Sequence, residues 1–541
     1  ADICFSVNDG PTFTPNFVQQ SLCDWWVQQR GDYGAKYTLG NVRLNKGVNK
    51  FSVVLREGDV KVDLPLYTAL VDYLDFSPIS PDFQVTKIEG VTEAANLFRR
   101  GDEIKLKMDF SNSAPKGSGF DFKLEDVWGQ TIKESRVTFE EGSTEYIMSF
   151  GSLPVGWYRM TFSNGAFADK LTDEFYFSVV APVSDLAEEN TRFTIESGIG
   201  YVKPDYQKRF IKSMEWLGVK EVREDTDPGP VLKDDTYLPS HYGLKQNRLH
   251  NSGIKILNVY EHFTWMNYKD LPTDLMEVYK MHKKLASYNE GTGDEYEIWN
   301  EQDGSFLYEP ADKYSSYHKA AALGISDGAS DALVSFGGLA GSREDPFDRL
   351  MLANDVMSYS DYYSYHAHID SGRGLKAIDY PQGKALGHVI MANAYNNDKP
   401  VWMNEGGISI PVDENNVAYR ESQLSQARYY IVSNAQAMAM GDDKRSWFRL
   451  GYFMEHGNTY GCHSENMCPY VVVNSISAFT NVMGKGTYKG ELANLPEGAE
   501  GYVFDSGKGD VAVIWCKNED AVEFNSNSRV KVTNFVGGEA Y

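Results

Sequence analysis

Apolar and polar residues alternate with a period of two through much of the first third of the chain. The pattern is clear in residues 50–64 ("KFSVVLREGDVKVDL"), 102–113 and 156–180, and Gly, Asn and Pro residues separate the runs. Such alternation is typical of strands that bury one face. We therefore predict a β-rich module in residues 1–80 and an immunoglobulin-like β-sandwich in residues 81–182.

The pattern changes near residue 186, where short apolar runs begin to alternate with longer stretches of helical spacing. Eight runs have the length and composition of buried strands: residues 192–200, 219–225, 254–263, 295–301, 332–341, 361–368, 399–407 and 446–457. Between them, residues 204–218, 311–326 and 421–441 carry apolar side chains at three- and four-residue spacing. Eight strand–helix units over roughly 290 residues is the size of a (β/α)8 barrel, which we predict for residues 186–484.

A β pattern returns after the predicted barrel. We predict a small C-terminal β module in residues 485–541. The tail "FVGGEAY" ends without a closing strand, so either N-terminal strands complete the module or the sequence is cut within it. The predicted fold class is therefore multidomain: a (β/α)8 barrel preceded by β-sandwich modules and followed by a small β module.

The composition narrows the classes of partner. The 541 residues include 76 acidic and 52 basic ones, a formal net charge of -24. This charge argues against nucleic acid and anionic membrane surfaces, because both bind to basic patches. No apolar stretch reaches the roughly 20 residues that span a bilayer, so we expect no membrane insertion.

The five cysteines leave two interpretations open. Cys462 and Cys468 are close enough in sequence to bridge a loop, and Cys4 can pair with Cys23; alternatively, the cysteines are buried free thiols. The sequence opens on Ala1 without a Met or an apolar leader. We therefore expect a removed signal peptide and a secreted, periplasmic or cell-surface protein.

Two of the predicted strands end on the dipeptide Asn-Glu: "EYEIWNE" (295–301) and "KPVWMNEGG" (399–407). They are the fourth and seventh strands, and the carboxyl ends of barrel strands face the active site. The other two Asn-Glu pairs, at 289–290 and 518–519, follow a helical run and lie in a polar turn. Two glutamates at the barrel mouth can converge on one bound atom, and a retaining glycosidase needs two carboxylates about 5–5.5 Å apart.

These stretches carry a resemblance to a known family. "EIWNE" and "VWMNEGG" resemble the acid/base and nucleophile segments of clan A glycoside hydrolases, which are retaining (β/α)8-barrel enzymes, and the resemblance covers residues 190–480. Within the clan, "DYYSYHAH" (361–368) is similar to a pattern of family 39, which includes β-xylosidases and α-iduronidases. The resemblance implies that Glu301 is the acid/base, Glu405 the nucleophile and a carbohydrate the substrate, with no cofactor and no metal.

The resemblance also implies roles for residues around the two glutamates. Arg223 would lie beside the nucleophile; its alternative is an ion pair with Glu221, Glu224 or Asp225 on its own strand. Asn300 would donate to the sugar 2-hydroxyl, a hydrogen bond that strengthens in the transition state.

Three further predictions concern the surroundings of the catalytic pair. His366 would reach the mouth and contact the nucleophile or the sugar, whereas Asn404 and Tyr365 would have structural roles. The strand-eight region would offer a sugar-binding side chain, and we predict this role for a set that also includes a tryptophan after strand three: Trp265, Trp447, Tyr452 and Glu455. A tryptophan in a strand is more often part of the core than a sugar platform.

Two other functions fit parts of the sequence. His366 and His368 form a His-x-His pair like that of zinc-dependent amidohydrolases, although those enzymes carry the pair on the first strand. A non-catalytic carbohydrate-binding protein would also keep a barrel and β modules. Neither alternative accounts for both Asn-Glu strands, so we favour a retaining glycoside hydrolase acting on a plant or algal poly- or oligosaccharide.

Overall fold

The computed structural model describes most of the chain beyond residue 82. The described residues are 2–7, 50–56, 83–168, 174–190, 192–199, 204–225, 248–260, 271–289, 295–304, 306–341, 346–370, 380–395, 398–413, 417–516 and 529–540. Of the predicted module 1–80, they include the antiparallel pair β1 (Asp2–Val7) and β2 (Phe51–Arg56). Trp265 and Cys23 lie outside the described residues.

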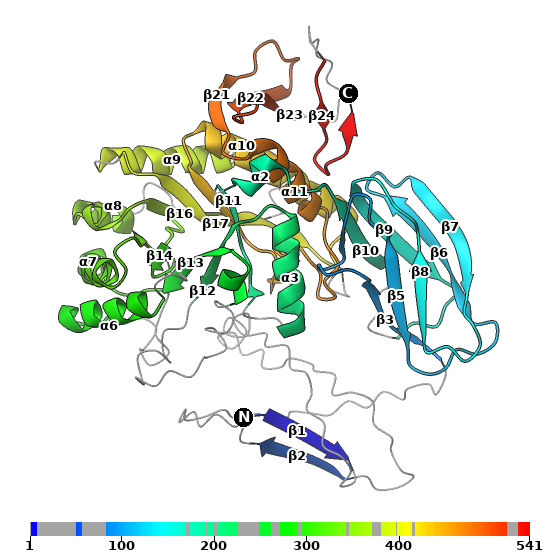
Figure 1. The fold of residues 1–541 in the computed structure, drawn as a ribbon. Coiled ribbons are helices and arrows are strands. Elements are labelled where there is room, and N and C mark those ends of the chain that lie inside the picture. The colour runs from blue at the N-terminus through cyan, green and yellow to red at the C-terminus, as the bar shows by residue number, and fades with distance from the viewer. Residues whose placement is uncertain are drawn as a thin grey trace.

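Residues 83–180 form two β-sheets that face one another (Figure 1). One sheet has the order β3 (Val85–Gly90), β5 (Lys105–Phe110) and β8 (Glu145–Ser149). The other has the order β4 (Leu97–Arg99), β10 (Glu174–Val180), β9 (Gly156–Ser163), β6 (Gly119–Asp126) and β7 (Thr131–Thr138). In β6, Phe120, Phe122 and Leu124 are buried while the residues between them are partly exposed, as the period-two pattern requires. The immunoglobulin-like assignment stays a prediction.

These two sheets are joined to the rest of the protein through buried hydrogen bonds. The indole Nε1 of Trp157 donates to the carbonyl oxygen of Pro469 at 2.8 Å, and Nδ2 of Asn96 donates to the carbonyl oxygen of Met467 at 3.0 Å. Both donor side chains are fully buried. The sheets therefore cover part of the wall of the adjoining α/β region.

Eight parallel strands form that α/β region. They are β11 (Phe193–Glu196), β12 (Glu221–Asp225), β13 (Lys255–Tyr260), β14 (Glu295–Ile298), β15 (Leu333–Phe336), β16 (Tyr363–Asp370), β17 (Val401–Pro411) and β18 (Lys444–Trp447). β18 pairs with β11, and a bridge between Leu339 and Tyr365 joins β15 to β16, so the ring closes. All eight predicted strands are present in the predicted order.

Helices lie on the outside of the ring (Figure 1). They are α2 (Asp185–Glu188), α3 (Pro204–Trp216), α6 (Leu275–Tyr288), α7 (Ala311–Gly328), α8 (Pro346–Ala353), the 3-10 turn η2 (Met357–Tyr359), α9 (Tyr380–Ala394), α10 (Arg420–Ala439) and α11 (Val472–Met483). The three helices predicted above correspond to α3, α7 and α10. Among the described residues, none of these helices has the length and apolar composition needed to cross a membrane.

Short strands follow the barrel. β19 (Met454–Glu455) and β20 (Asn458–Thr459) form a hairpin beside β17, and β21 (Thr487–Glu491), β22 (Ala499–Asp505) and β23 (Asp510–Cys516) form a three-stranded sheet. β24 (Val532–Thr533) pairs with β25 (Glu539–Ala540). Among the described strands, β1 and β2 pair with each other and not with this C-terminal set. The boundaries of the four predicted domains stay predictions.

Of the two interpretations of the cysteines, that of buried free thiols is confirmed for Cys462 and Cys468. These two residues therefore do not bridge the loop between them. The backbone explains why: the loop is closed by hydrogen bonds from Ser464 N to Cys468 O and from Tyr470 N to Cys462 O. A covalent closure is therefore not needed to hold this turn.

Charged side chains fill much of the barrel interior, where branched apolar residues are usual. The amino-terminal layer contains Glu221, Glu295 and Lys444 from β12, β14 and β18, and all three are buried. Two residues further along β12 and β14 stand Arg223 and Glu297, which are also buried. This second pair forms the floor of the site at the carboxyl ends of the strands.

Candidate active site

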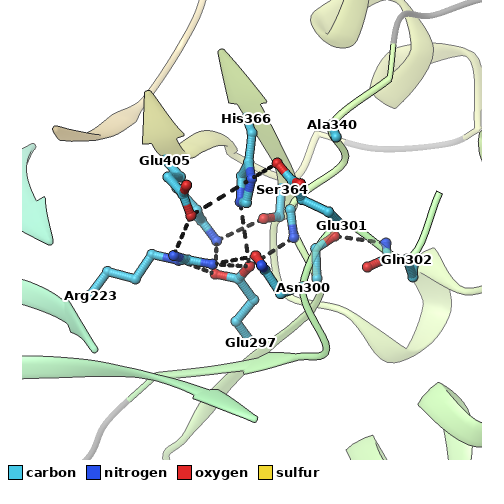
Figure 2. A network of polar contacts seen from close by, with 12 residues as sticks. Arg223, Glu297, Asn300, Glu301, Gln302, Ala340, Ser364, His366 and Glu405 are labelled. Carbon is cyan, nitrogen blue, oxygen red and sulfur yellow. Dashed lines mark hydrogen bonds and ion pairs between the residues drawn. The ribbon is translucent and has the colours of Figure 1, made fainter. Parts of the chain in front are cut away.

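The two glutamates predicted to be catalytic lie at the carboxyl ends of their strands. Glu405 belongs to β17, and Glu301 follows the end of β14. Trp299 and Glu301 have φ angles of 79° and 43°, so the chain turns sharply after β14. The backbone N–H of Glu301 donates to the carbonyl oxygen of Gly338 at 3.1 Å. This turn directs the Glu301 side chain toward His366 (Figure 2).

An irregular register brings two neighbouring side chains of β17 into the barrel. The pairing with β16 slips by one residue between Met403 and Glu405, which leaves Asn404 as the extra residue of a bulge. In a regular strand, Asn404 and Glu405 would point to opposite faces. Here Asn404 donates to Glu297 at 2.7 Å, and Glu405 accepts from Arg223 at 2.6 Å.

The distances from one imidazole nitrogen to the two glutamates limit how far apart their carboxylates can lie. Nδ1 of His366 lies 2.9 Å from Oε1 of Glu301 and 3.8 Å from Oε2 of Glu405. The two carboxylate oxygens are therefore no more than about 7 Å apart, a limit that includes the 5–5.5 Å separation of a retaining carboxylate pair. Both carboxylates keep contact with solvent, since the side chain of Glu301 is 21% exposed and that of Glu405 13%.

Arg223 binds the proposed nucleophile directly. Its Nη1 donates to Oε2 of Glu405 at 2.6 Å, and its Nη2 donates to Oδ1 of Asn300 at 2.8 Å (Figure 2). Nη1 also donates to Oε2 of Glu196 at 3.0 Å. The predicted contact with Glu405 is therefore present. The alternative ion pairs with charged neighbours on β12 are not the ones that hold this guanidinium, because its partners come from β11, β14 and β17.

The electrostatics separate the titrating groups of the site. Burial opposes the charge on Glu405, but His366, Arg223 and a hydrogen bond from His368 hold the pKa of its carboxyl well below the usual range. Burial likewise opposes the charge on His366, yet Glu405, Glu297 and Glu301 outweigh it and raise the pKa of His366 to about 10. At neutral pH, Glu405 is therefore an anion and His366 a cation.

The predictions for three polar residues can be compared with their contacts. Asn300 accepts from Arg223 through Oδ1, so this hydrogen bond does not use its NH2 group, which is a donor. Asn404 is buried and donates to Glu297 and Ser364, as expected of a structural residue. Tyr365 is buried, donates to Asp442 at 3.0 Å and stacks on His388, so it packs away from the site.

The predicted sugar platforms are only partly supported. Trp447 is buried and packs against Tyr430 of α10 at a ring distance of 5.1 Å, so its prediction as a platform is wrong. Glu455 is half-buried and interacts electrostatically with both Glu405 and Glu301, which puts it beside the site. Tyr452 is half-buried and its role stays a prediction, as does that of Trp265, which is outside the described residues.

The sequence interpretation missed two side chains of the site, Glu297 and Phe448, and considered a third, His368, only as a possible zinc ligand. Glu297 holds Arg223 from below, and Phe448 packs edge-on to His368 at a ring distance of 5.3 Å. His368 itself donates to Oε1 of Glu405 at 2.9 Å. The signal for Glu297 was available, because a charged residue in the apolar run before Asn-Glu needs a partner when it is buried.

Three of these side chains could also bind a cation. The ligand atoms of Glu301, His366 and His368 lie within 4.8 Å of one another. Imidazole and carboxylate are ligands that zinc accepts. In this structure, however, His366 hydrogen-bonds to Glu301 and His368 to Glu405, so a metal ion would have to replace both hydrogen bonds.

The chain is similar in structure, but not in sequence, to known proteins. No protein-family model and no curated protein sequence matches the chain. A family 39 glycoside hydrolase from Bacteroides cellulosilyticus WH2 superposes with a TM-score of 0.63 at 15% identity, over 84% of this chain and 96% of that one. The two chains therefore share a fold.

Other solved structures are less similar. A glucosidase from Croceicoccus marinus superposes with a TM-score of 0.44 at 12% identity, over 60% of this chain and 76% of that one. A β-glucuronidase from Parabacteroides merdae gives 0.38 at 12% identity, over 75% and 55%. The family 39 enzyme is therefore the relevant structural neighbour among these three.

Proposed function

We propose that this protein is a retaining glycoside hydrolase with Glu301 as acid/base and Glu405 as nucleophile. The observation that carries the proposal is the pair of distances from Nδ1 of His366, 2.9 Å to Glu301 and 3.8 Å to Glu405. A second support is the ionised state of Glu405, which a nucleophile requires. The fold shared with a family 39 glycoside hydrolase agrees with this activity.

The reaction would take place in two steps. In the first, a carboxylate oxygen of Glu405 forms a bond to the anomeric carbon while the bond to the leaving oxygen breaks, and Glu301 gives its proton to that oxygen. In the second, Glu301 takes a proton from water, the water oxygen bonds to the anomeric carbon, and the bond to Glu405 breaks. The first step leaves Glu301 as the carboxylate that accepts a proton in the second step. The second step restores the protonated Glu301 and the free carboxylate of Glu405.

The surrounding residues would hold the nucleophile for this attack. His368 binds Oε1 of Glu405 and Arg223 binds Oε2, so both oxygens have a fixed direction. Asn300, fixed by Arg223, would offer its NH2 group to the sugar 2-hydroxyl. We further infer a plant or algal poly- or oligosaccharide as substrate and an exported protein, as the sequence predicts.

The test is a pair of substitutions with a chemical rescue. Glu405→Ala and Glu301→Ala should each reduce hydrolysis of an aryl β-glycoside by about 10⁴-fold or more, because neither step can proceed without both carboxyl groups. Added azide should restore turnover of Glu405→Ala and give a glycosyl azide, since a small anion can take the vacated place of the carboxylate. Unchanged hydrolysis in both folded variants would refute the proposal.

The grouping of Glu301, His366 and His368 favours a second candidate, a metal-dependent hydrolase. In that case, purified protein would contain about one equivalent of zinc, and a chelator would abolish activity that zinc restores. A glycoside hydrolase of the proposed kind would keep its activity in the chelator. A non-catalytic sugar-binding protein would bind oligosaccharides without turnover, with or without Glu405.

A further inference from the structure

We propose that Glu297 is a positioning residue of this site, which fixes the direction of Arg223 toward the nucleophile and lies on the opposite side of His366 from the acid/base. This inference rests on the proposed hydrolase function. Glu297 lies on β14, four positions before Glu301, and its side chain is 0% exposed. It touches neither the expected position of the anomeric carbon nor solvent, and it acts through its neighbours.

The first link runs through Arg223 to the nucleophile. Nε and Nη2 of Arg223 donate to Oε2 and Oε1 of Glu297, at 3.0 and 3.1 Å (Figure 2). A guanidinium is planar, so two hydrogen bonds along one edge fix the direction of the remaining nitrogen. That nitrogen, Nη1, is the one that donates to Glu405 at 2.6 Å. A lysine or a one-point contact would not transmit this direction.

The second link runs through His366 to the acid/base. Nε2 of His366 lies 3.8 Å from Oε1 of Glu297, while Nδ1 on the other side of the ring lies 2.9 Å from Glu301. A Cβ atom at Gly338 would lie 2.1 Å from Nε2 of His366, so only glycine leaves room for this ring. The backbone N–H of Gly338 instead donates to Glu297 at 2.8 Å.

The charge of Glu297 is permanent over the working range of an enzyme. Burial opposes the charge, but Arg223 and His366 outweigh it and lower the pKa of Glu297 to about 2. Asn404 adds a hydrogen bond at 2.7 Å, so the carboxylate has donors on both oxygens. Glu297 is therefore a fixed anion between two cations.

The groups that influence His366 come from four elements. Glu297 and Glu301 belong to β14 and the turn after it, and Glu405 belongs to β17. His368 lies on β16, the strand that carries His366 itself, and the two rings are 6.2 Å apart. His388 of α9 interacts with His366 electrostatically. Of the three carboxylates, Glu301 and Glu405 change charge during the proposed reaction. Glu297 is the carboxylate beside His366 whose charge the proposed reaction leaves unchanged.

The experiment compares Glu297→Gln with Glu295→Gln. Both substitutions replace a buried glutamate of β14 with an amide of nearly the same shape, but Glu295 faces Lys444 at the other end of the barrel. Glu297→Gln should reduce kcat/KM for an aryl glycoside by about 100-fold, mainly through kcat, as expected for the loss of one preorganised charge. Glu295→Gln should leave kcat/KM per folded molecule within about twofold.

A second readout does not depend on turnover. With 13C-labelled histidine, NMR gives the titration midpoint of the His366 ring, assigned with His366→Asn. We expect this midpoint to fall by at least one pH unit in Glu297→Gln and to stay unchanged in Glu295→Gln. If the wild-type protein hydrolyses no glycoside, the proposed function fails, and the NMR shift still tests the contact between Glu297 and His366.

A conservative variant separates the two links. Glu297→Asp keeps the charge but shortens the side chain, so it should restore the His366 midpoint while kcat/KM stays reduced by the weakened grip on Arg223. It also serves if Glu297→Gln does not fold. A folded Glu297→Gln with unchanged kcat/KM and an unchanged His366 midpoint would overturn the inference. So would equal losses of kcat/KM in Glu297→Gln and Glu295→Gln.

Discussion

The two ends of the barrel interior are built from the same strands, but the charged groups at one end stabilise the fold and those at the other end form the candidate active site. At the amino-terminal end, Nζ of Lys444 donates to both oxygens of Glu221 and of Glu295, at 2.8 to 2.9 Å. The ring of Trp402 covers this ammonium at 3.9 Å, and Tyr362 stacks on Trp402 at 3.6 Å. The charged groups at this end are therefore enclosed by one another and by aromatic rings. We call Glu221, Glu295 and Lys444 the sealed cluster and this end of the barrel the sealed end.

At the carboxyl-terminal end, Arg223 also lies among carboxylates, but two of the acids of that site stay accessible. Glu297 is fully enclosed, whereas Glu405 and Glu301 keep an open side toward solvent. A buried charge costs less when its hydrogen bonds are complete, and reactivity needs one direction left free. The comparison teaches that access to the carboxylate, and not the presence of an ion pair, separates the stabilising cluster from the reactive one.

Among the changes that test this comparison of the two ends, the largest effect should come from replacing the cation of the reactive end. Arg223→Lys keeps the charge but loses the fork that binds Glu297 and Glu405 together, so kcat/KM should fall by about 10³-fold. Steady-state kinetics on an aryl glycoside measure this loss, and thermal unfolding shows whether the variant is folded. A Lys variant as active as the wild type would mean that charge alone is enough.

The matching change at the sealed end should act on stability and not on rate. Lys444→Met leaves Glu221 and Glu295 without their cation, and breaking a buried ion pair costs about 3–5 kcal/mol. We expect a clear fall in Tm by calorimetry, with kcat/KM unchanged at a temperature where the variant is folded. Loss of rate at full folding would show that the two ends are not independent.

The smallest predicted effect is a pH dependence of stability that arises from Glu295 at the sealed end. Burial, together with the carboxylate of Glu221 and against Lys444, raises the pKa of Glu295 from 4.5 to about 8. The folded chain therefore holds an extra proton between these two values, and its stability falls as pH rises through that window. The contribution is on the order of 3 kcal/mol between about pH 5 and pH 8.

Glu295→Gln should remove this dependence. Urea unfolding of the wild type and of Glu295→Gln at several pH values measures the difference in slope. The free energy of unfolding of the wild type should fall relative to that of the variant as pH rises from about 5 to about 8. Parallel curves would show that Glu295 is ionised throughout and that the sealed cluster carries one more negative charge than we infer.

The sequence predicted the strands of the barrel because buried parallel strands are apolar over their whole length, which distinguishes them from alternating strands. It also predicted Glu301 and Glu405, since both follow such strands directly. Glu297 was missed because a carboxylate within an apolar run looks like the polar position of a half-exposed strand. The apolar run indicates that this carboxylate needs a partner if it is buried, but the partner, Arg223, comes from another strand and is identified only by the structure.

Register explains the remaining differences. Trp447 and Phe448 are neighbours, so one points toward the helices and the other toward His368, and a single residue of register decides which. The bulge at Asn404 likewise depends on the pairing of β16 with β17, which the sequence of β17 alone does not contain. Predictions that rest on pairing between distant segments therefore fail where predictions from local pattern succeed.

The buried hydrogen bonds between the β-sheets of residues 83–180 and the barrel wall have a practical consequence for protein engineering. Trp157 and Asn96 donate to carbonyl oxygens of Pro469 and Met467, just before α11. Expressing the barrel alone would leave these two acceptors and their apolar surroundings facing water. Residues 83–180 should thus be kept as part of the smallest piece used for crystallisation or directed evolution, and not removed as a detachable tag.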